Sequence, residues 1–89
     1  MRREEAESLA LQGLAFLAGD ERRLGALLVQ AGWTLAELRA QAGEPSVLAG
    51  VLDFLLADEK LLIAFSEETS VAPERITRAR ALLPGHPLD

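Results

Sequence analysis

The feature that most constrains the fold is an internal similarity at a spacing of 38 residues. Residues 9–21 align without a gap on residues 47–59, and the alignment continues over 22–41 and 60–79. The identical pairs are Leu14/Leu52, Phe16/Phe54, Leu17/Leu55, Asp20/Asp58, Glu21/Glu59, Leu24/Leu62 and Ala26/Ala64. A repeat of this length predicts two copies of one structural unit, residues 4–43 and 44–83, related by a pseudo-two-fold axis.

Each unit is expected to form three helices, because its apolar residues recur at helical spacing and no segment alternates as a strand would. The expected helices cover 4–18, 21–31, a short segment ending at Gly43, 46–57, a segment after Asp58, and a last helix from Pro73 to Leu83. The sequence therefore predicts an all-α fold. It is a compact bundle of about six short helices in a single domain, 1–83, followed by a flexible tail, 84–89.

Helix-end signals mark the breaks between these segments. Asp20 and Asp58 are each placed to accept hydrogen bonds from the first amides of the next helix. Gly32 provides a left-handed exit residue. Thr34 and Glu37 have the spacing of a capping box, and Trp33, one residue before the cap, is expected to pack onto Leu38.

The two first helices, 6–18 and 46–57, are the least polar, so they are expected to pack against each other at the centre. Leu14 and Leu52, equivalent in the repeat, are both expected to be buried. Asp53 interrupts the second of these helices. It either keeps an outward face soluble or pairs with an arginine, and a functional role is the alternative.

The chain has few of the residue types that commonly act in catalysis. The chain has no cysteine, no tyrosine and one histidine, His86, in the expected tail. These counts exclude a disulfide scaffold, a thiolate zinc site and a cysteine nucleophile. The acidic pairs that begin at Asp20 and Asp58 are interpreted as caps rather than metal ligands. We therefore expect no enzyme, with no catalytic residue, cofactor or metal.

The charge balance disfavours nucleic acid and anionic membranes as partners. Nine basic and fourteen acidic residues give a net charge of −5 and a pI near 4.8. No segment has the pattern of a signal peptide or a membrane span, so we expect a cytoplasmic protein. The alternative is a weak helix-turn-helix-like nucleic-acid binder that uses Arg75, Arg78 and Arg80 on the last helix.

An apolar content of 49% is more than a small core readily hides. Four apolar residues fall off the inward stripes of their helices, and the single tryptophan is either a packing residue or a binding anchor. This candidate interaction surface consists of Leu11, Val29, Trp33, Leu56 and Ile63. The favoured function is a non-catalytic protein–protein interaction or regulatory adaptor module, with an unknown protein partner or a second copy in a homodimer.

Three motifs carry a family resemblance. They are the Phe-Leu-x-x-Asp blocks at 16–20 and 54–58, Leu38 and Arg39 after a Gly-Trp turn, and the Pro-Glu-x-Ile-x-x-Ala-Arg segment that starts at Pro73. Over essentially its whole length the chain resembles the bacterial, mainly alphaproteobacterial, family called domain of unknown function 3572. The resemblance implies a cytoplasmic bacterial setting, and it implies no activity, cofactor or site residue.

Overall fold

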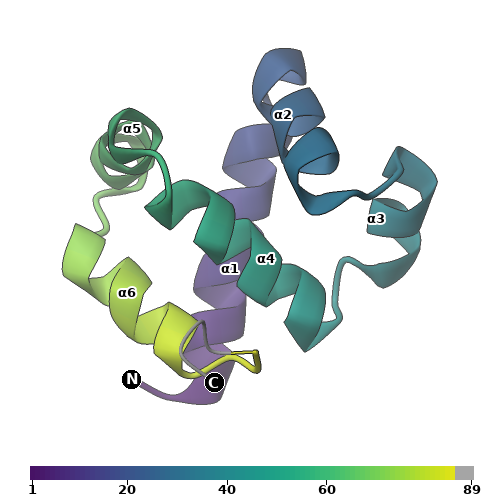
Figure 1. The fold of residues 1–89 in the computed structure, drawn as a ribbon. Coiled ribbons are helices and arrows are strands. Elements are labelled where there is room, and N and C mark those ends of the chain that lie inside the picture. Colours follow the sequence, from purple (N-terminus) through teal and green to yellow (C-terminus); the bar gives the residue numbers. More distant parts are fainter. Residues whose placement is uncertain (86–89) are drawn as a thin grey trace.

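A computed structural model describes residues 1–85, and these residues form six helices without a strand (Figure 1). They are α1 (Arg3–Ala18), α2 (Glu21–Ala31), α3 (Leu35–Gln41), α4 (Pro45–Leu56), α5 (Glu59–Thr69) and α6 (Pro73–Ala81). The predicted all-α fold is confirmed, and the breaks fall where the helix-end signals place them.

Two helices end slightly earlier than the sequence predicts. Helix α3 ends at Gln41 rather than Gly43, and α6 ends at Ala81 rather than Leu83. In each case a tighter turn closes the helix. The N–H of Glu44 donates to the carbonyl of Gln41 over 2.9 Å, and the N–H of Leu83 donates to the carbonyl of Arg80 over 3.1 Å. In these turns an N–H bonds to the carbonyl three residues earlier, as in a 3₁₀-helix, and not to the carbonyl four residues earlier, as in an α-helix.

The predicted caps are present. Asp20 accepts from the amides of Arg22 and Arg23 at 2.9 and 3.3 Å, and Asp58 accepts from the amide of Leu61 at 3.2 Å. The Thr34–Glu37 capping box is complete, with both hydrogen bonds formed. Gly32 leaves α2 in the left-handed conformation (φ 75°), and Ser70 leaves α5 in the same conformation (φ 58°).

The core lies where α1 and α4 cross, as expected for the two least polar helices (Figure 1). Gly13 on α1 permits this close approach, because a Cβ placed there would lie 2.8 Å from Leu55 Cδ1 on α4. On the α4 side, Val51, Leu52 and Leu55 are fully buried. The remaining helices are arranged around this contact between α1 and α4.

The third helices of the two units pack differently. Helix α6 lies against both α1 and α4, while α3 lies at the opposite edge of the molecule (Figure 1). Leu52 is fully buried, but Leu14 is only half-buried, so the expectation of equal burial is wrong for Leu14. The pseudo-two-fold repeat stays a prediction.

Candidate functional site

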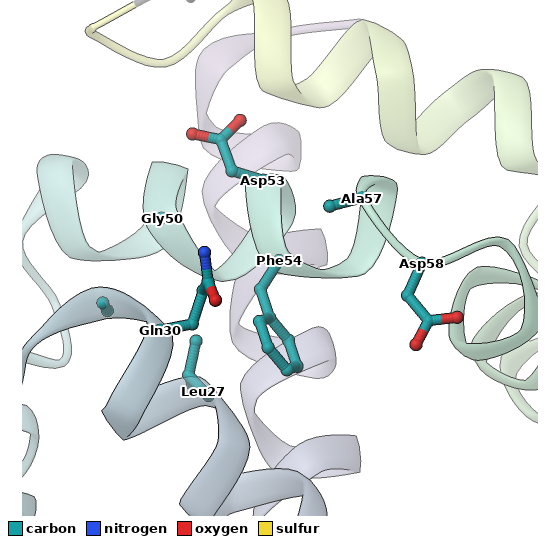
Figure 2. Close-up of a pocket in the computed structure, with 8 residues that line it drawn as sticks. Leu27, Gln30, Gly50, Asp53, Phe54, Ala57 and Asp58 are labelled. Atoms are coloured by element: carbon teal, nitrogen blue, oxygen red, sulfur yellow. The ribbon is translucent and has the colours of Figure 1, made fainter.

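A cleft of about 530 Å³ opens between α2 and α4. Its walls are mainly apolar, and Figure 2 shows Phe54 of α4 pointing to the side where α2 carries Leu27. Leu27 is fully buried, Phe54 is half-buried, and Ala31 and Ala57 are exposed. The lining residues are Leu27, Gln30, Ala31, Gly50, Asp53, Phe54, Ala57 and Asp58. We call this space the α2–α4 cleft.

Two small residues, one on α4 and one at its C-terminal cap, line the cleft. Gly50 and Ala57 lie seven residues apart on the helix, so both face the same side. Trp33 packs beside Gly50, because a Cβ on Gly50 would lie 2.8 Å from the Cη2 atom of the indole ring. Trp33 is half-buried and packs against the core, which supports the packing interpretation of this residue.

Asp53 lines the cleft, but its carboxylate points away from Phe54, towards the side of α4 on which α6 lies (Figure 2). The Nε of Arg80 donates to Asp53 Oδ1 over 2.6 Å. This pair agrees with the interpretation of Asp53 as a partner of an arginine. Because the arginine opposes its charge, Asp53 contributes less to the potential in the cleft than a free carboxylate would.

Arg80 is only 5% exposed, and its guanidinium connects α4 to the end of α6. Besides Asp53, it donates to the backbone carbonyls of Leu83 at 3.3 Å and Pro84 at 3.1 Å, and to that of Gly85. The expected flexible tail therefore begins with two residues that are held against the fold. Residues 86–89, and His86 with them, lie outside the described residues.

A second hollow, of about 330 Å³, adjoins the cleft and shares Phe54 and Asp58 with it. Three cationic side chains contribute to its walls, and we call it the basic hollow. Its lining residues are Arg22, Arg23, Ala26, Phe54, Asp58, Lys60 and Leu61. The hollow lies where α2 and α5 begin, so residues from the first turns of both helices meet there.

Comparison with known proteins gives one match. The chain fits the model of the family described as Protein of unknown function (DUF3572) over residues 3–86. The chain belongs to this family. No curated protein and no solved structure matches it. Membership in DUF3572 agrees with the resemblance seen in the sequence and assigns no activity to the cleft or to the basic hollow.

The predicted interaction residues of this DUF3572 chain differ in their exposure. Val29 is 85% exposed, and Leu11 and Ile63 are 45% and 44% exposed. Leu56 and Trp33 are half-buried and pack against the core. None of the five lines the cleft. Sequence reasoning missed the cleft itself, although Gly50 and Ala57, small residues within an apolar segment, were the available signal.

The three arginines of the predicted basic stripe do not share one surface. Arg75 is exposed and lies 3.8 Å from Glu5 of α1, measured from Nη2 to Oε2. Arg78 is exposed, whereas Arg80 is buried and engaged by Asp53 and three carbonyls. Only two of the three can therefore reach a ligand in this structure, and one of these already has an acidic neighbour.

Residues 1–85 contain neither a metal-ligand cluster nor a membrane-spanning helix. No group of three or more acidic or histidine side chains lies close enough together to hold a metal ion within that range. In the same part of the chain, no helix is long and apolar enough to cross a membrane. We take the groove formed by the α2–α4 cleft and the basic hollow as the candidate site, because the two spaces adjoin each other and share Phe54 and Asp58.

Proposed function

We propose that this DUF3572 chain is a binding module that receives an apolar side chain of another protein in the α2–α4 cleft. The observation that carries the proposal is the cleft itself. It is an apolar recess of about 530 Å³ with polar groups at its edge, on the surface of a small domain. Binding sites commonly combine apolar walls with a few polar groups in this way.

The size of the cleft suits a large apolar side chain. Moving such a side chain from water into an apolar site is worth about 1.5–3 kcal/mol. Phe54 is half-buried in the free protein, so a ligand that covers it adds to this gain. Gln30 at the edge provides a donor and an acceptor that can orient the bound segment.

A protein segment is favoured over a small molecule by the surface around the cleft. The cleft adjoins the basic hollow and shares Phe54 and Asp58 with it. A small ligand confined to the cleft would leave the hollow empty, whereas an extended protein segment can cover both. Burial of apolar area, such as the walls of the cleft, is the general driving force of protein association.

Nucleic-acid binding by the last helix has less support. Such binding needs a stripe of available cations, and Arg80 is committed to Asp53 and to backbone carbonyls. Arg75 has Glu5 nearby at 3.8 Å. A chain with a net charge of −5 also repels phosphates at long range.

The test is a selection from a displayed library of random peptides on the wild-type protein, followed by affinity measurements on two variants. Ala57→Arg places a long charged side chain in the cleft. Ala18→Arg is the matched control, because Ala18 is also an exposed alanine at the end of a central helix and does not line the cleft. Both variants should keep wild-type stability, since both alanines are exposed.

We expect selected peptides to bind the wild type and Ala18→Arg with equal affinity. They should bind Ala57→Arg at least about tenfold more weakly, because about tenfold corresponds to the loss of one buried apolar contact. Peptides that bind all three proteins equally would contradict the proposal, as would a selection that enriches no peptide. Selected peptides that bind Ala57→Arg more weakly than Ala18→Arg would support the proposal.

A further inference from the structure

We infer that the basic hollow receives a carboxylate of the bound segment, so that the partner presents an acidic residue beside the apolar side chain that enters the cleft. This inference rests on the proposed function and adds the chemistry of the partner. It starts from the fact that the hollow and the cleft share Phe54. A segment that covers Phe54 therefore contacts both spaces.

Two of the three cations in the hollow are uncommitted. Within residues 1–85, neither Arg22 nor Lys60 has a carboxylate oxygen within 4.0 Å, although four other ion pairs form in that range. Both residues are exposed, so their donors are accessible to solvent and to a ligand. An incoming carboxylate can accept from them without first breaking an internal ion pair.

The third cation is held in place before a ligand arrives. The guanidinium of Arg23 lies 4.6 Å from the centre of the Phe16 ring, and its Nε lies 3.9 Å from Asp20 Oδ2. Phe16 is itself fixed by an edge-to-face contact with the buried Phe65, with 5.3 Å between ring centres. A cation positioned by the fold loses less entropy on binding than a free one.

The local charge of the hollow is opposite to that of the whole protein. Three cations and a single carboxylate, that of Asp58, line the hollow, while the chain carries a net charge of −5. Asp20 already accepts from the amides of Arg22 and Arg23, and Asp58 accepts from that of Leu61. The cationic side chains are the donors that we assign to the ligand.

An acidic peptide suits this arrangement better than a polyphosphate chain. A nucleic acid needs cations that follow its backbone, and here the cations are confined to one small hollow of about 330 Å³. The negative net charge of the protein opposes a polyanion more strongly than a segment with one or two carboxylates. The apolar cleft alongside also requires an apolar neighbour, which a peptide side chain provides.

The experiment uses the peptides selected on the wild-type protein. Each is compared with a synthetic twin in which every Glu and Asp is replaced by Gln and Asn. Both are measured against wild type, Arg22→Gln, Lys60→Gln and the control Arg39→Gln, at low and high salt. Arg39 is the control because it is an exposed arginine on α3, outside the hollow.

We expect the selected peptides to contain acidic residues and to lose about two- to fivefold in affinity with each of Arg22→Gln and Lys60→Gln, as for partly exposed ion pairs. Arg39→Gln should leave the affinity unchanged. The amide twin should bind more weakly to the wild type and should respond to neither variant, and salt should weaken only the acidic peptide.

Peptides that depend on the cleft by the Ala57→Arg criterion but lack acidic residues would overturn this inference and leave the proposed function intact. An amide twin that binds as tightly as its parent would overturn it in the same way. If no peptide depends on the cleft, the proposed function fails and this inference fails with it.

Discussion

Replacing Arg80 with methionine removes the guanidinium that connects α4 to the end of α6, and we expect a substantial loss of stability. Arg80 is 5% exposed, and it donates to Asp53 and to the carbonyls of Leu83, Pro84 and Gly85. Methionine preserves most of the apolar stem and removes every donor. The comparison therefore isolates the hydrogen bonds and the ion pair.

The magnitude follows from the surroundings of the four acceptors. The Asp53 side chain is 46% exposed, so solvent screening limits the ion pair to about 1 kcal/mol or less. The carbonyl of Leu83 is buried with its donor, and those of Pro84 and Gly85 are partly buried. At about 1 kcal/mol for each hydrogen bond, the free energy of unfolding should fall by about 2–4 kcal/mol.

Urea denaturation followed by the fluorescence of Trp33, the single tryptophan, measures this loss. Arg78→Met is the matched control, an exposed arginine on the same helix, and it should change stability by less than about 0.5 kcal/mol. Arg80→Lys should be intermediate, because an ammonium keeps the charge but not the spread of donors. A value for Arg80→Met within about 0.5 kcal/mol of the wild type would mean that these hydrogen bonds do not stabilise the fold.

Three further substitutions test the packing by the same denaturation assay. Leu52→Ala, at a fully buried position, should cost about 2–5 kcal/mol, and a cost near zero would mean that the central helix is misplaced. Gly25→Ala should stabilise α2 by about 0.5–1 kcal/mol, because a Cβ there meets open space. Gly50→Ala should destabilise by about 1–3 kcal/mol, since its Cβ would meet Trp33, and any gain in stability would contradict the observed contact.

Local signals in the sequence predicted most of the fold. Capping side chains act over three residues, so Asp20, Asp58 and the Thr34–Glu37 box could be recognised without tertiary information. The central packing of α1 and α4 followed from their low polarity. These signals act between residues that are close together in the chain, so they can be recognised from the sequence alone.

Contacts between distant helices were less accessible. The Asp53–Arg80 pair joins residues 27 positions apart, and helical projection shows only that Asp53 points outward. Arg80 also fitted a basic stripe by spacing, yet the turn after α6 folds back onto it and buries it. The two third helices looked alike in sequence, but only α6 packs closely against both α1 and α4. Leu14 and Leu52 also occupy equivalent repeat positions, yet Leu14 is less buried than Leu52.

The candidate site was the least predictable part. A cleft forms where two helices do not fill the space between them, and the small size of Gly50 and Ala57 becomes meaningful only when α2 is placed opposite them. The residues chosen from the sequence were large and apolar instead. Of these, Val29, Leu11 and Ile63 are exposed as expected, and none of the three lines the cleft.

Binding in the α2–α4 cleft can be located by a map of amide chemical shifts, recorded by NMR as a selected peptide is added to the isotopically labelled wild-type protein. If the α2–α4 cleft is the binding site, the largest changes will fall on residues 27–31 and 50–58, together with the indole N–H of Trp33 beside Gly50. Changes concentrated on α3, or around Leu11 and Ile63, with the cleft amides unmoved, would contradict the account.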